Sequence, residues 1–396
     1  MKAEAGGRMS RMARVGLALL PLVLLAGLLA WIVRSGPAEA VRGEAPPVEV
    51  LRIQRIELAP EQITVSVLND GPDPAKIAQV QVDDAYWSFA QEPAGELRHL
   101  GRARLRIPYP WVKGEAHVVQ LVTSTGVTFK REIPVAVATP RPSWRSLWVF
   151  ALIGIYVGVV PVALGLLWYP LAGRLGPRAM DFLLALTLGL LLFLLVDALH
   201  EGFEVASGLA QAFQGVALLV FGTGAAYLAL EALGGWLSRR KGGLGGAWVT
   251  ALLLATGIGL HNFGEGLSIG AALALGERAL GTLLILGFTL HNTTEGLAII
   301  APIAKSRVPV RRLFLLGLIG GVPTIAGAWL GGFVYSPVWS VLFLGLGAGA
   351  IAQVIVQITR GVAGGRPLAA YLRSAPAVAG FFTGFAVMYG TGMLVQ

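Results

Sequence analysis

The sequence predicts a mainly α-helical, polytopic membrane protein with a small all-β domain near its N-terminus. Of its 396 residues, 55% are hydrophobic and 13% are charged, whereas soluble proteins carry about 25% charged residues. Eight long apolar segments follow residue 147, each near the ~20 residues that cross a bilayer. Between residues 48 and 138, hydrophobic residues instead recur with a period of two, which is typical of strands. Together these observations exclude a soluble enzyme and a disordered chain.

Residues 1–40 form the first element, a basic head followed by an apolar run from Val15 to Val33. This run exceeds the ~7–15 residues of a signal-peptide core, so we expect a retained membrane anchor. The alternative is a cleaved leader, because Ala38-Glu39-Ala40 resembles a cleavage site. Both interpretations export the segment that follows.

Residues 41–142 are expected to form an extracytoplasmic β-sandwich domain and a linker. Apolar and polar residues alternate over 63–67 and 102–107, and turn signals such as Asn69-Asp70-Gly71 interrupt the pattern. The domain resembles an immunoglobulin-like module, with a partner that the sequence does not identify. Four of its residues could bind a metal, although solvated strand and loop positions are the favoured interpretation: Asp83, Asp84, His99 and His117.

Residues 143–396 are expected to form an eight-helix transporter-like domain. The predicted spans are 147–168, 181–200, 212–235, 247–274, 279–303, 313–333, 338–359 and 376–395. If the sandwich lies outside, the cytoplasmic loops hold 12 of the 14 Lys and Arg residues after Pro142, as the positive-inside rule requires. We therefore expect a cell membrane protein (inner or plasma membrane) with its C-terminus outside and, if the anchor is retained, its N-terminus inside. The net charge of +9 then needs no nucleic-acid partner.

Two near-copies of one polar motif lie in the fourth and fifth of these spans. They are His261-Asn262-Phe263-Gly264-Glu265-Gly266 and His291-Asn292-Thr293-Thr294-Glu295-Gly296. Residues four apart share one helix face, so each His lies beside its Glu. His261 falls 14 residues into its span and His291 12 residues into the returning span, or about 21 and 18 Å at 1.5 Å per residue. Both depths are near the middle of a hydrocarbon core of about 30 Å.

Two carboxylates at that depth predict a bound divalent cation, because a buried charge is costly unless it is compensated. Imidazole and carboxylate ligands suit Zn²⁺ and the later first-row metals, and Asn and Glu also admit manganese or cadmium-sized ions. The expected ligands are His261, Asn262, Glu265, His291, Asn292 and Glu295. The alternative is that each His and Asn only bonds between helices.

A second polar stripe ends the second span. Its members are Asp197, His200, Glu201 and Glu204, and their spacing places them on one helix face. We expect an outer vestibule that collects cations or adds ligands. The alternative is a plain solvated helix end.

The doubled motif on adjacent helices resembles the ZIP (Zrt/Irt-like) family of metal-ion transporters. The resemblance covers residues 147–396 and implies eight helices, both ends outside, metal held by the six motif residues, and transport of divalent cations toward the cytoplasm. The chain departs from the family in three ways. Gly264 and Thr294 replace a common proline, no Asp or Glu follows Glu295, so that Gln353 and Gln357 are the nearest substitutes, and a His-rich cytoplasmic loop is missing.

The sequence thus predicts transport of Zn²⁺ or a related divalent metal as substrate, with no enzymatic activity, and with a homodimer as a candidate assembly. Protons would be released or exchanged, because His and Glu bind metal when deprotonated. The alternative is an intramembrane zinc-dependent hydrolase that uses His200, His261 and His291. A third hypothesis is a metal-sensing receptor whose sandwich binds a partner.

Overall fold

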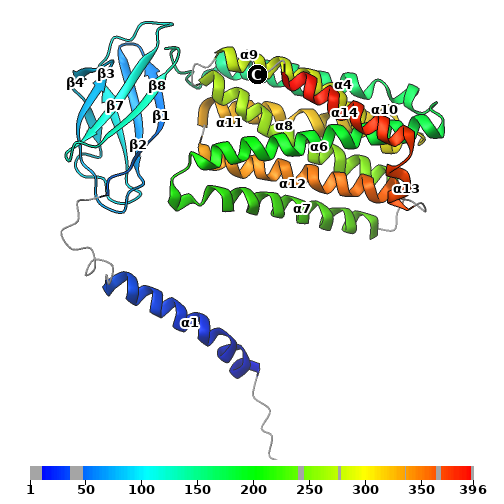
Figure 1. Cartoon of the computed structure of the whole chain (residues 1–396), viewed down its shortest axis with the longest axis horizontal. Coiled ribbons are helices and arrows are strands. Elements are labelled where there is room, and N and C mark those ends of the chain that lie inside the picture. Colours follow the sequence, from blue (N-terminus) through cyan, green and yellow to red (C-terminus); the bar gives the residue numbers. More distant parts are fainter. Residues whose placement is uncertain are drawn as a thin grey trace, which may run out of the picture. The chain divides into compact units, whose positions relative to one another are not determined.

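The computed structural model describes residues 11–35, 48–239, 245–274, 278–334, 336–362 and 367–393. The chain divides into two compact units, Met1–Val48 and Glu49–Gln396. The first unit contains helix α1 (Arg11–Ser35), labelled in Figure 1. Its apolar part, Leu19–Ile32, falls inside the segment expected to be an anchor.

The strands form two four-stranded antiparallel sheets. One has the order β1-β2-β6-β5 and the other β4-β3-β7-β8 (Figure 1). The strands are β1 (Leu51–Ala59), β2 (Gln62–Asn69), β3 (Ile77–Val82), β4 (Ala85–Trp87), β5 (Ala90–Glu92), β6 (Arg102–Ile107), β7 (His117–Thr123) and β8 (Thr128–Ile133). Both sheets contribute to one core, which includes Val65, Leu105 and Leu121, all 0% exposed. The predicted period-two alternation in β2 and β6 is confirmed, because each second residue is buried.

A polar network in this β region joins Asp83, Tyr109 and His117. Asp83 Oδ2 accepts hydrogen bonds from the Tyr109 hydroxyl at 2.7 Å and from His117 Nδ1 at 2.6 Å. Burial alone would raise the pKa of Asp83, but the hydrogen bonds from Tyr109, His117 and the Val118 backbone outweigh it and lower that pKa. Burial and the bond to Asp83 raise the pKa of Tyr109 to about 12. Two of the four candidate metal-binding side chains are thus paired with each other, and a third, His99, contacts Gly71 O at 2.8 Å.

Seven helical segments of the described chain are long and apolar enough to cross a membrane. The first four are α3, η1, α4 and α5 together (Trp144–Ala172), α6 (Pro177–Ser207), η2 (Gln211–Phe213) with α7 (Gly215–Arg239), and α8 (Gly246–Ala274). The other three are Gly281–Ile303, which contains most of α9 (Arg278–Ile300) and η3 (Ala301–Ile303), then α10 and α11 together (Val310–Val334), and residues Pro337–Gly361 of α12 (Pro337–Val362). The eighth expected span corresponds to α14 (Ala375–Met393), which follows the short helix α13 (Leu368–Leu372). The apolar part of α14 is shorter, Ala375–Gly390.

Two of these segments are interrupted beside a proline. In the first, α3 (Trp144–Gly154) passes into the π-helical turn η1 (Ile155–Val159) before α4 (Val160–Leu166), which carries Pro161 in its first turn. In the other, α10 (Val310–Gly321) ends and α11 (Pro323–Val334) begins at Pro323. Proline lacks an N–H and so leaves the carbonyl four residues earlier without its helical donor.

Small residues bring the helices close together. A Cβ on Gly327 of α11 would lie 2.0 Å from Phe263 O of α8, and a Cβ on Gly349 of α12 would lie 2.0 Å from Thr223 O of α7. The glycine-rich run 345–349 therefore packs helices, as expected of small residues in membrane bundles. In Figure 1 the long helices α6, α7, α8 and α12 lie side by side.

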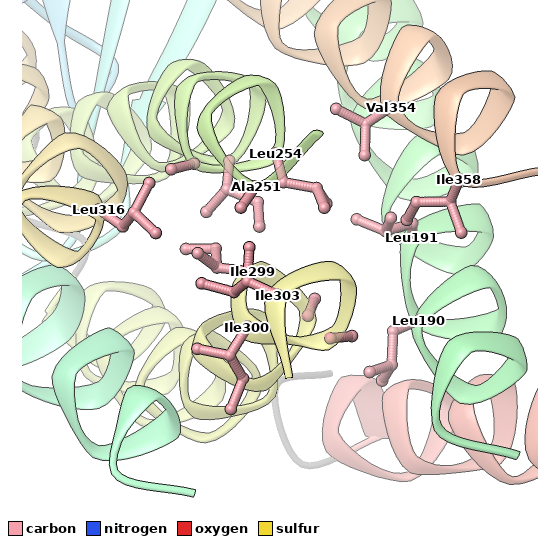
Figure 2. Close-up of a cluster of buried hydrophobic side chains, with 14 of the residues drawn as sticks. Leu190, Leu191, Ala251, Leu254, Ile299, Ile300, Ile303, Leu316, Val354 and Ile358 are labelled. Atoms are coloured by element: carbon pink, nitrogen blue, oxygen red, sulfur yellow. The ribbon is translucent and has the colours of Figure 1, made fainter. Parts of the chain in front are cut away.

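An apolar cluster fills the bundle between α6, α8, α9, η3, α10 and α12 (Figure 2). On α8 its members Leu254 and Ile258 precede His261, and on α9 its members Ile299 and Ile300 follow Glu295. Because α8 and α9 are consecutive and return on each other, the cluster lies on one side of the two motifs along the bundle. We call it the apolar plug.

Candidate metal centre

The two motifs lie on α8 and on α9 (Arg278–Ile300). All six motif side chains are buried, with exposed fractions from 0% for both asparagines to 8% for His261. The i, i+4 spacing makes His261 and Glu265 neighbours on α8, as predicted: His261 Nε2 lies 3.2 Å from Glu265 Oε1. The carboxylates therefore point into protein and not into lipid.

Glu265 is the residue at which the two helices meet. Its Oε1 is hydrogen-bonded to His291 Nε2, and its Oε2 accepts a hydrogen bond from Asn292 Nδ2 at 2.9 Å. Ligand atoms of His261, Glu265 and His291 all lie within 4.8 Å of one another, and this is the one such group of His, Cys, Asp or Glu within the described ranges. Two imidazoles and a carboxylate at this spacing suit Zn²⁺ and similar ions.

Glu295 has a different environment from Glu265. It is 2% exposed, and its carboxylate oxygens make no hydrogen bond of normal geometry, although the Asn262 side chain makes a weak contact with it. It interacts electrostatically with Glu265, His261 and His291, so it belongs to the same polar region. Buried polar groups are nearly always satisfied, and a carboxylate without a donor is costly. A divalent cation is the chemical group that would compensate both carboxylates, so the residues present fit one.

The two motif asparagines each donate to the backbone of another helix. Asn262 Nδ2 donates to Gly320 O at 3.1 Å, and Asn292 Nδ2 donates to Val157 O at 3.0 Å. Both Oδ1 atoms are buried and have no hydrogen-bond partner. The amide nitrogens thus hold helices together while the amide oxygens stay available to a cation.

The second polar stripe lies on α6, and one of its residues reaches α8. Glu201 is partly buried and accepts a hydrogen bond from Ser268 Oγ at 2.6 Å, and it interacts electrostatically with His261 and Glu265. The other three side chains are exposed: Asp197, His200 and Glu204. Ser268 was missed in the sequence, although it lies three residues after Glu265 and therefore on the same helix face.

The proposed glutamine substitutes do not join the centre. Gln353 Nε2 donates to Glu231 Oε2 at 3.3 Å, and Glu231 also pairs with Arg360. Gln357 lines a cavity of about 480 Å³ at the ends of α6, α7, α8 and α12, together with Met180, Thr250 and Lys305. The amide nitrogen of Gln353 is thus directed toward α7 and Gln357 lies at the bundle end, while Gln353 Oε1 is buried without a hydrogen-bond partner.

Comparisons with known proteins add no relative. Neither a scan against protein-family models nor a search of curated proteins found a match to this chain.

Proposed function

We propose that this protein transports divalent metal cations, with Zn²⁺ as the first candidate, through the buried centre on α8 and α9. One observation carries the proposal: Glu265 and Glu295 are both buried near two imidazoles in an apolar bundle, and Glu295 makes no hydrogen bond of normal geometry. One divalent cation would balance the two negative charges. The doubled motif, with its resemblance to ZIP transporters, supports the same proposal.

The proposed path runs from the α6 stripe to the centre and then to the basic end of the bundle. Asp197, His200 and Glu204 are exposed, and Glu201 connects them to Ser268 beside the centre. The apolar plug follows the centre along the bundle, and two of its members, Ala301 and Ile358, line the same cavity as Lys305. Metal would enter at the stripe and leave toward the cytoplasm once the plug opens, as in alternating access. In this proposal the immunoglobulin-like sandwich lies outside the cell.

The hydrolase alternative receives less support from the geometry. It needs His200 as a third histidine, but the compact group contains His261, Glu265 and His291, and His200 is an exposed residue of α6.

Flux of Zn²⁺, Mn²⁺, Co²⁺ and Cd²⁺ into proteoliposomes tests the proposal. We expect wild-type protein to move at least one of these ions, and Glu265→Gln and Glu295→Gln to abolish the movement. Glu231→Gln is the matched control, because this membrane carboxylate pairs with Arg360 outside the centre. Equal flux in wild type and in both centre variants would refute the proposal, as would cleavage of a peptide or lipid without metal flux.

A further inference from the structure

Asn292 makes more contacts outside its own helix than a simple metal ligand needs. Its Nδ2 donates to Val157 O at 3.0 Å and to Glu265 Oε2 at 2.9 Å. An amide nitrogen carries two hydrogens, so both are committed. The side chain thereby joins α9 to the π-helical turn η1 and to the carboxylate that both histidines approach.

Pro161 explains why Val157 needs this donor. In an α-helix the carbonyl of Val157 would accept from the N–H of the residue four positions later. That residue is Pro161, which has no N–H. A carbonyl inside an apolar bundle cannot turn to water and needs a donor from elsewhere. Asn292 therefore donates to a carbonyl whose α-helical donor is missing; the π-helical donor to Val157 O would be the N–H of Val162, five residues later.

The second motif asparagine also donates near a helix break, but to a different carbonyl: the one four residues before Pro323 belongs to Ile319. Asn262 Nδ2 donates to Gly320 O, which lies in the last turn of α10 just before Pro323. Carbonyls in the last turn of a helix lack intrahelical donors. Each copy of the motif thus ties the centre to one proline-interrupted helix. Asn292 also donates to the Glu265 carboxylate at 2.9 Å, and the Asn262 side chain makes a weaker contact with the Glu295 carboxylate.

We infer that Asn292 is a positioning residue that couples the placement of Glu265 to the bend of the helix at Pro161. With both amide hydrogens committed, the Glu265 carboxylate cannot shift without disturbing the contact to η1. Metal affinity at the centre therefore depends on Pro161, which is not a ligand. This inference rests on the proposed metal centre and concerns how one of its residues works.

A double-mutant cycle with Asn292→Ala and Pro161→Ala tests the coupling. The probe is Co²⁺, whose visible spectrum and dissociation constant are measured on purified full-length protein in detergent. Asn292→Ala should weaken binding about 10- to 100-fold, the usual cost of losing a residue that orients a ligand, and should alter the spectrum. Pro161→Ala provides an N–H opposite Val157 O. In the Pro161→Ala background, Asn292→Ala should weaken Co²⁺ binding by a distinctly smaller factor, because the backbone N–H gained at position 161 then donates to Val157 O in place of Asn292.

Asn292→Asp separates positioning from ligation and does not depend on the alanine variants folding. It keeps an oxygen for the metal but places a carboxylate against two acceptors, Val157 O and Glu265. A residue that only ligates would bind Co²⁺ at least as tightly after this change, whereas we expect weaker binding. Pro170→Ala is the control, since Pro170 lies in the first turn of α5 (Tyr169–Ala172), where a missing N–H matters little.

The outcomes distinguish this inference from the proposed function. Additive effects of Asn292→Ala and Pro161→Ala, or wild-type affinity in Asn292→Asp, would overturn the inference and leave the metal centre in place. A wild-type protein that binds neither Co²⁺ nor Zn²⁺ would overturn both.

Discussion

Without bound metal, we expect neutralising Glu295 to stabilise the folded protein and neutralising Glu265 to destabilise it. Glu295 is buried without a hydrogen bond of normal geometry and lies near the Glu265 carboxylate, so Glu295→Gln removes a poorly satisfied charge and its repulsion with Glu265. An unsatisfied buried group costs about 1–3 kcal/mol, and more when it is charged. We expect the metal-free variant to gain about 1–3 kcal/mol in its free energy of unfolding.

Glu265→Gln is the matched comparison, since it makes the same chemical change one helix away. Glu265 accepts hydrogen bonds from His291 and Asn292 and lies 3.2 Å from His261 Nε2. Breaking a buried ion pair by removing one partner costs about 3–5 kcal/mol. Metal-free Glu265→Gln should therefore be less stable than wild type by about that amount.

Both variants should also be stabilised less by Zn²⁺ than wild type is. A ligand present at 100 times its dissociation constant stabilises the folded state by about 2.7 kcal/mol. Wild type should show this gain with Zn²⁺, and both variants should lose most of it. The assay is denaturant or thermal unfolding in detergent, with and without Zn²⁺. A metal-free Glu295→Gln protein less stable than wild type would refute the reasoning, as would full stabilisation of either variant by Zn²⁺.

Three further predictions concern other parts of the fold. In the β domain, the neutral Tyr109 phenol contributes stability that is fully present below its ordinary pKa of 10.0 and is lost as pH rises through about 12. Tyr109→Phe should remove this alkaline loss of stability. Because it also removes a hydrogen-bond donor to Asp83, it should move acid unfolding to higher pH, as followed by near-UV circular dichroism. In the apolar plug, Ile299→Ala should cost about 2–5 kcal/mol of stability and raise metal flux in proteoliposomes, because the side chain is fully buried beside the centre. Between α8 and α11, Gly327→Ala should lower the melting temperature by several degrees, since its Cβ would lie 2.0 Å from Phe263 O.

Each of these predictions has a control elsewhere in the same region. Tyr86→Phe affects an exposed ring, Leu286→Ala an exposed residue of α9, and Gly224→Ala a glycine with open space around it. All three should behave as wild type. Unchanged alkaline unfolding in Tyr109→Phe, flux at the wild-type rate in Ile299→Ala, or an unchanged melting temperature in Gly327→Ala would contradict the corresponding argument.

Local pattern in the sequence was enough to locate the helices, the strands and the contact between His261 and Glu265, whereas His291 contacts Glu265 of the other helix and not Glu295 of its own motif. Apolar runs of bilayer length predicted the helices because lipid requires every backbone group to be bonded within its own segment. Period-two alternation predicted the buried face of β2 and β6 because successive strand residues point to opposite sides. The pairing of His261 with Glu265 followed from their spacing, since residues four apart lie on one helix face.

The contacts between different helices could be identified only from the tertiary structure. Glu265 contacts His291 and Asn292, whereas Glu295 makes no hydrogen bond of normal geometry, and this difference depends on how α8 and α9 are rotated against each other. Each of the two helices packs closely against another element far away in the chain: Gly327 of α11 approaches Phe263 of α8, and Gly296 of α9 approaches Val162 of α4. Two further contacts could not be predicted from spacing in the sequence. Gln353 hydrogen-bonds to Glu231 of another helix, and the bond from Asn292 to Val157 depends on packing between α9 and the segment interrupted at Pro161.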